Sequence, residues 1–131
     1  QQILARNELA CSLGSELTSC LEIWAYVQSM PEPGRAIIGF GKRDAAFDAG
    51  FPIPTLHVDQ QGQISAANSN WKIEKMMDQH AMMKVPNDTT LRVGDIVAFA
   101  TSHPCLTFDK WRYINVIDDN YNVVDVVETY F

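Results

Sequence analysis

The sequence predicts a mainly β fold, a small β-barrel or sandwich built as one domain. Short apolar or alternating stretches recur along the chain, and turn-forming Gly, Pro, Asn and Asp residues separate them. The length of 131 residues suits a single domain, and a hydrophobic content of 47% is sufficient for a core. The chain has no internal repeat and no alternating strand–helix pattern, which argues against a parallel α/β barrel.

The first strand is predicted over residues 21–28, because apolar side chains alternate there with polar or amphipathic ones. Its apolar face carries Leu21, Ile23, Ala25 and Val27, and its other face carries Glu22, Trp24, Tyr26 and Gln28. A turn over residues 30–34 leads to a second strand over residues 35–40. The segment Gly39-Phe40-Gly41 lacks the third glycine of a dinucleotide-binding fingerprint, so we expect a loop there.

The remaining strands are predicted from similar patterns. They comprise a hairpin over residues 56–59 and 62–64, strands over residues 72–77 and 81–85, a central strand over residues 96–101, and a final pair over residues 112–117 and 123–129. The last strand is mostly β-branched, so we expect it inside a sheet.

Composition excludes several classes of partner. A net charge of −6 and a pI near 4.8 are unsuited to a nucleic-acid backbone. No apolar run approaches the roughly 20 residues that span a membrane, and the N-terminus does not resemble a signal peptide. The three cysteines, Cys11, Cys20 and Cys105, are too few for a disulfide framework, so we expect a cytoplasmic location. Because the chain starts with Gln, we expect a processed chain or a fragment.

His103 and Cys105 flank Pro104 directly after the most apolar run of the chain, residues 96–100. In an extended backbone, residues i and i+2 point to the same face, so the imidazole and the thiol would converge. Together they suit a borderline-soft metal such as zinc. Taken alone, such a pair is more often a small buried cysteine and a hydrogen-bonded histidine.

The wider segment SHPCLTFDKWR, residues 102–112, closely resembles the metal-binding segment of the D-serine dehydratase-like proteins. This group includes D-serine dehydratases, related D-amino-acid deaminases and low-specificity D-threonine aldolases, which are pyridoxal-phosphate enzymes of the alanine-racemase-like fold type. The segments PEPGRAIIGFGKRDAAFDAGFPIP, MMDQHAMM and VVDVVETYF are also similar to that family, so the resemblance covers residues 20–131. It implies that His103 and Cys105 are zinc ligands.

The resemblance further implies that residues 18–131 are a C-terminal β-domain and that residues 1–17 are a connector from an N-terminal (β/α)₈ barrel. That barrel would hold pyridoxal phosphate, so the chain alone is expected to be inactive. The complete enzyme would be a lyase that converts a D-serine-like D-amino acid to an α-keto acid and ammonia. The aromatic face that carries Trp24 and Tyr26 is expected to serve docking and self-association, and we expect a homodimer.

Two further segments bear on the reaction. Alanine racemases carry a catalytic tyrosine in a G-Y-x-D-G segment, and the similar place here holds Phe40, which has no ionisable hydroxyl. This departure favours a dehydratase or deaminase over a two-base racemase. The same comparison places Asp78 and His80 near the active site as candidate catalytic residues. The alternative is that Asp78 caps a turn and that His80 is a half-exposed strand residue.

The other polar and aromatic side chains have structural explanations. Asp109 is expected to cap a turn or to support a zinc ligand, and His57 is expected at the surface. The tryptophans are expected to pack in the core or an interface, and these are Trp24, Trp71 and Trp111. The methionines are expected to fill the core, and these are Met76, Met77, Met82 and Met83. Two other functions stay open. One is a low-specificity D-threonine aldolase, in which a carboxylate more often stands at the position of Cys105, and the other is a stand-alone β-domain that binds zinc or a partner without catalysis.

Overall fold

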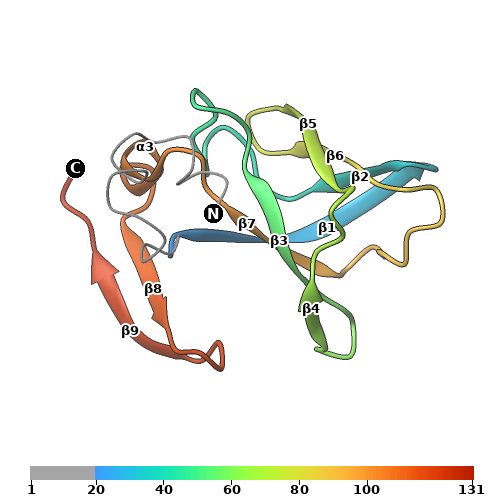
Figure 1. Ribbon diagram of the computed structural model, residues 1–131. Helices are drawn as coiled ribbons and strands as arrows, with labels where there is room; N and C mark the ends of the chain where they lie inside the picture. The colour runs from blue at the N-terminus through green and yellow to red at the C-terminus, as the bar shows by residue number, and fades with distance from the viewer. Residues whose placement is uncertain (1–19) are drawn as a thin grey trace, which may run out of the picture.

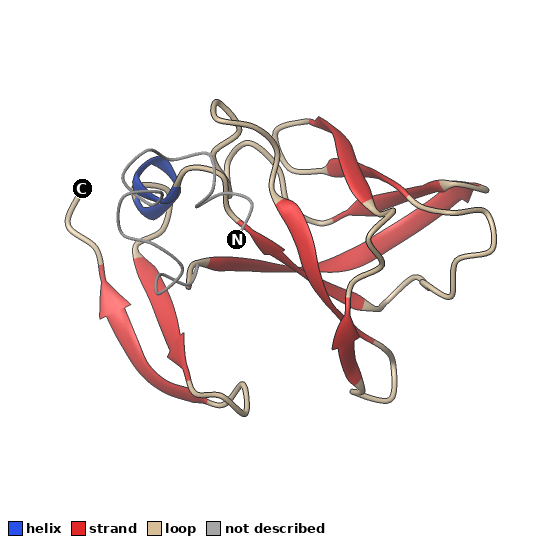
Figure 2. Ribbon diagram, viewed as in Figure 1, coloured by secondary structure: helices blue, strands red, loops and turns tan. Residues whose placement is uncertain are grey.

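The computed structural model describes residues 20–131 and confirms the mainly β fold (Figures 1 and 2). The elements of this part of the chain are β1 (Glu22–Glu32), β2 (Arg35–Ile38), β3 (Ile53–Val58), β4 (Ile64–Ala66), β5 (Lys72–Met76), β6 (Ala81–Lys84), β7 (Ile96–Ala100), α3 (Pro104–Phe108), β8 (Tyr113–Ile117) and β9 (Val123–Glu128). The expected connector over residues 1–17 lies outside the described residues. Across residues 20–131, no helix has the length and apolar character needed to cross a membrane.

Seven of the strands form one antiparallel sheet in the order β4-β3-β7-β1-β2-β6-β5. The first half of the long strand β1 pairs with β7, and its second half pairs with β2. The sheet curls until β5 contacts β3 near the opposite end of the strand order. This closure around one core agrees with the predicted small barrel or sandwich.

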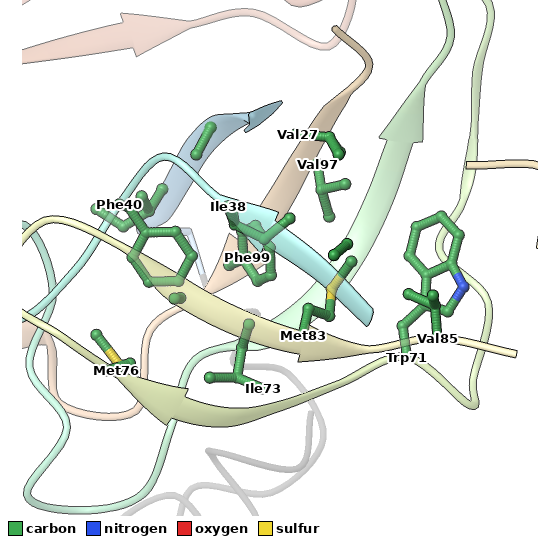
Figure 3. Close-up of a cluster of buried hydrophobic side chains, with 14 of the residues drawn as sticks. Val27, Ile38, Phe40, Trp71, Ile73, Met76, Met83, Val85, Val97 and Phe99 are labelled. Atoms are coloured by element: carbon green, nitrogen blue, oxygen red, sulfur yellow. The ribbon is translucent and has the colours of Figure 1, made fainter. Parts of the chain in front are cut away.

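The core lies inside the curled sheet, where the alternation predicted for β1 is confirmed. Ile23, Ala25 and Val27 are buried, whereas Trp24 and Tyr26 are exposed. The other large core side chains include Ile38, Phe40, Trp71, Ile73, Met76, Met83, Val85, Val97 and Phe99 (Figure 3). The rings of Phe40 and Phe99 pack with their centroids 4.8 Å apart. Phe40 is therefore a core residue, and Met77, which is exposed, departs from the expected packing role of the methionines.

Strands β8 and β9 form a separate hairpin that stands apart from the large sheet (Figure 1). The prediction that the last strand lies inside a sheet is wrong, because β9 pairs with β8 alone among the described strands. Its valines, Val123, Val124, Val126 and Val127, are all exposed. A two-stranded hairpin is only marginally stable by itself. An exposed apolar surface of this kind is typical of a site that another protein segment covers.

The turn of this hairpin is held by Asp118. Its carboxylate accepts the backbone N–H groups of Asn120 and Asn122, each at 2.9 Å. The hydrogen bonds from Asn122 lower the pKa of the Asp118 carboxyl, so protonation would weaken the turn only as the pH falls through that lowered value. Tyr121 adopts a φ of 63° and packs on Trp24 at 5.3 Å between ring centroids, which ties the hairpin to β1.

His57 is not the surface residue that the sequence predicted. Its side chain is 12% exposed, and its Nε2 lies 2.8 Å from Oδ2 of Asp95, which is 2% exposed. The ring of Trp71 packs edge-on against the imidazole at 5.4 Å. Because Asp95 also accepts the backbone N–H of Arg92, this pair joins β3 to the turn that precedes β7.

We expect His57→Ala to lower the free energy of unfolding by about 3 kcal/mol, because it leaves the buried Asp95 carboxyl without its side-chain partner. Urea unfolding of the wild type and of the variant measures the loss. In an Asp95→Asn background the same change should cost less, because the two residues interact directly. Equal losses in both backgrounds would contradict the coupling.

Candidate functional site

The His-Pro-Cys segment begins a helix and does not continue the strand. After β7 ends at Ala100, His103 occupies the N-cap of α3, with φ −138° and ψ 89°, and Pro104 takes the first helical position. The extended geometry expected for this segment is wrong, because the fixed φ of proline suits the first turn of a helix as well as a strand. His103 is partly exposed, and Cys105 in the first turn is exposed to solvent.

His103 is hydrogen-bonded to a residue that sequence reasoning did not identify. Its Nδ1 lies 2.9 Å from Oδ2 and 3.1 Å from Oδ1 of Asp48. The hydrogen bond from His103 lowers the pKa of the Asp48 carboxyl, so the interaction is lost only as the pH falls through that lowered value. An ionised carboxylate can only accept, so Nδ1 carries the proton and, in the neutral imidazole, Nε2 keeps a free lone pair.

Asp48 belongs to the 39–52 loop, which connects β2 to β3. The hydroxyl group of Thr107 attaches this loop to α3. It donates to the carbonyl of His103 at 2.9 Å and accepts the backbone N–H of Ala46 at 3.1 Å. A second attachment is the hydrogen bond from Nε1 of Trp111 to the carbonyl of Asp44, at 2.7 Å. The loop and the helix therefore hold Asp48 beside His103.

The other end of the 39–52 loop contacts the turn between β5 and β6, which carries Asp78 and His80. The carbonyls of Met77 and Asp78 accept the backbone N–H groups of Lys42 at 2.8 Å and Arg43 at 3.1 Å. A Cβ atom on Gly41 would collide with the backbone of Met77 and Asp78, so only glycine allows this approach.

The side chains of Asp78 and His80 are both exposed on this turn. Within residues 20–131, no hydrogen bond or ion pair joins either of them to His103 or Cys105. One loop thus supports both groups of candidate residues, and a catalytic role for Asp78 and His80 stays a prediction.

Asp48 could not be found from local sequence, because 55 residues separate it from His103. The nearer candidate, Asp109, is the exposed C-cap residue of α3, and its side chain takes part in none of the hydrogen bonds within residues 20–131. The available signal was the Asp48-Ala49-Gly50 triplet in the glycine-rich segment. Gly50 has a φ of 113°, a conformation that favours glycine, and its N–H closes a turn onto Phe47.

A family model described as "Putative serine dehydratase domain" matches residues 20–117. The chain belongs to this family. No curated protein matches the chain. The match includes the 39–52 loop, the turn that carries Asp78 and His80, and α3 with both candidate metal ligands.

Solved structures share the fold of this serine dehydratase domain. D-threonine aldolase from Filomicrobium marinum superposes with a TM-score of 0.66 at 18% identity, over 80% of this chain and 26% of the aldolase. D-threo-3-hydroxyaspartate dehydratase from Delftia sp. HT23 gives a TM-score of 0.66 at 14% identity, over 94% of this chain and 36% of the dehydratase. A metal-free cysteine-to-alanine mutant of D-threo-3-hydroxyaspartate dehydratase gives 0.66 at 13% identity, with the same coverage. The chain thus spans about a quarter to a third of these structures.

His103 and Cys105 supply an imidazole nitrogen and a thiol, which are donor types that zinc accepts. His103 presents Nε2 while its Nδ1 is bound to a carboxylate, the arrangement typical of metal-ligating histidines. Cys105 offers an exposed thiol in the adjacent turn. Within residues 20–131, no group of three or more His, Cys, Asp or Glu side chains could hold a metal, so a closed four-ligand structural site is not formed there.

An apolar hollow of about 400 Å³ lies next to α3, between the start of β1 and the β8–β9 hairpin. Ile23, Trp24, Thr107, Trp111, Tyr113 and Tyr121 are among the residues that line it. Thr107 and Trp111 also hold the 39–52 loop, so the hollow shares two lining residues with the attachment of that loop to α3.

We expect Thr107→Val to destabilise the domain by about 1–3 kcal/mol, because the buried N–H of Ala46 loses its acceptor while the side-chain volume hardly changes. Hydrogen exchange at the Ala46 amide should accelerate at the same time. Thr107→Ser retains the hydroxyl and serves as the matched control. Equal exchange rates at Ala46 in the valine and serine variants would show that the hydroxyl does not fasten the loop.

Proposed function

We propose that this domain is the zinc-binding C-terminal part of a pyridoxal-phosphate-dependent lyase. The lyase would convert a D-serine-like D-amino acid to an α-keto acid and ammonia. The observation that carries the proposal is Nε2 of His103, which has no hydrogen-bond partner within residues 20–131 and stands two residues before the exposed thiol of Cys105. The family match over residues 20–117 supports the assignment.

His103 and Cys105 would hold the metal through Nε2 and Sγ. A zinc ion held there would supply Lewis acidity toward the β-hydroxyl group of the substrate, which would leave as water. Two protein ligands leave positions open for substrate and water, as a catalytic site requires. The thiol at position 105, where D-threonine aldolases more often have a carboxylate, favours the dehydratase over the aldolase.

Asp78 and His80 are proposed as the polar groups that face the substrate. Their support is that both side chains are exposed on a turn whose backbone is fixed by the 39–52 loop. The imidazole of His80 would serve as an acid or a base for the substrate, and Asp78 would orient the substrate beside it. Phe40 is buried in the core and offers no hydroxyl there, which favours a dehydratase over a two-base racemase.

A (β/α)₈ barrel outside these 131 residues would bind pyridoxal phosphate, which supplies an electron sink for bond cleavage at the α-carbon. The solved structures with this fold are about three to four times the length that the chain covers, which leaves room for such a domain. We place the barrel on the exposed apolar face of the β8–β9 hairpin and the adjacent hollow. The expected homodimer stays a prediction.

The test uses the full-length protein that carries this domain. His103→Ala and Cys105→Ala should each abolish keto acid and ammonia release from D-serine, while the visible absorbance of bound pyridoxal phosphate is retained. The reason is that zinc serves the leaving hydroxyl and not cofactor binding. The measurements are zinc content, cofactor absorbance and keto acid release.

Cys20→Ala is the matched control, because Cys20 is the other exposed free cysteine of the described chain and should be dispensable for zinc and activity. Full activity of Cys105→Ala would end the zinc-dependent proposal. Release of glycine and an aldehyde from D-threonine, without keto acid from D-serine, would indicate the aldolase. Zinc binding without either activity would indicate a stand-alone binding domain.

A further inference from the structure

We infer that Asp48 is a positioning residue, whose carboxylate fixes the tautomer and orientation of His103 and thereby strengthens metal binding at Nε2. The inference rests on the proposed zinc function and deepens it. Both carboxylate oxygens of Asp48 lie within 3.1 Å of Nδ1 of His103, so the imidazole is held in the tautomer that leaves Nε2 without a proton.

An ordinary surface pair would not have this effect, because exposed charged pairs contribute little and exchange readily with water. Asp48 and His103 are themselves half-exposed, at 50% and 36%. Buried hydrogen bonds behind the pair maintain the distance between the two side chains instead. Thr107, which is 1% exposed, binds the N–H of Ala46, two residues before Asp48, and the carbonyl of His103 through the same hydroxyl. The buried hydroxyl group of Thr107 thus joins the backbone of the loop near Asp48 to the backbone of His103.

The turn that carries Asp48 is also specific. Gly50 closes it onto Phe47 at 3.3 Å and adopts a positive φ that a side chain would strain. The spacing of Asp48 and Gly50 therefore has a physical reason, since the glycine lets the loop turn back immediately after presenting the carboxylate. Asp109 lies much nearer to the ligands in sequence but is exposed and makes no side-chain hydrogen bond within residues 20–131.

The first experiment needs no metal. Nitrogen-15 NMR of the 131-residue chain, at a pH where His103 is neutral, reports which ring nitrogen carries the proton. The wild type should show the proton on Nδ1 of His103, and Asp48→Ala should shift it toward Nε2. Asp109→Ala removes the same charge from the other end of α3 and should leave the tautomer unchanged. An unchanged tautomer in Asp48→Ala would overturn the inference.

The second experiment measures metal affinity by competition, with cobalt(II) as a spectroscopic probe for zinc. Asp48→Ala should weaken binding by about 10–100-fold, the cost typical of removing a carboxylate behind a histidine ligand. Asp109→Ala should bind like the wild type. Equal weakening in both variants, or none in Asp48→Ala, would overturn the positioning role. Unchanged hydrogen exchange at Ala46 in Asp48→Ala confirms that the loop is still attached.

These outcomes separate the inference from the proposed function. If the wild type shows no thiolate-to-cobalt absorption band, Cys105 is not a metal ligand and the proposed zinc function fails. The tautomer measurement still decides whether Asp48 positions His103 in that case. If the wild type binds cobalt through Cys105 and Asp48→Ala binds equally well, the zinc function survives and the inference fails.

Discussion

The hydroxyl group of Thr107 joins the two segments on which the candidate zinc site depends. It donates to the carbonyl of His103 in α3 and accepts the N–H of Ala46 in the 39–52 loop. Because this hydroxyl is buried, water does not compete for either hydrogen bond. These buried hydrogen bonds therefore fix the positions of the half-exposed Asp48 and His103 relative to each other. Because Asp48 then binds Nδ1 of His103, the lone pair of Nε2 is left for another partner.

The 39–52 loop also explains why two distant sequence motifs belong to one functional region. Gly41 lets its first part lie against the backbone of Met77 and Asp78, and Gly50 turns its last part after Asp48. The core contact between Phe40 and Phe99, directly before Gly41, attaches the start of the loop to the curled sheet. The loop is therefore attached to the strands at its start and to α3 near Asp48, which suits a site that must keep its donor atoms in place.

The strands of the large sheet were predictable from sequence, because alternation in β1 and turn residues around β3 and β4 are local signals. The candidate ligands, His103 and Cys105, were identifiable from one contiguous segment. Their helical backbone was not, since Pro104 is compatible with a strand and with a helix start. The partner pairs of Asp48 with His103 and of His57 with Asp95 join residues 55 and 38 positions apart, so tertiary structure alone reveals them. The exposure of β9 could not be predicted either, because β-branched residues are typical of strands whether or not another element covers them.

We propose that His103 and Cys105 together form a zinc site with open positions. X-ray absorption at the zinc edge of the zinc-loaded 131-residue chain tests it most directly, because the method counts the atoms bound to the metal. We expect one sulfur at about 2.3 Å and one imidazole nitrogen at about 2.0–2.1 Å, with oxygen in the remaining positions. A first shell made of oxygen alone, or one containing several sulfur atoms, would contradict it.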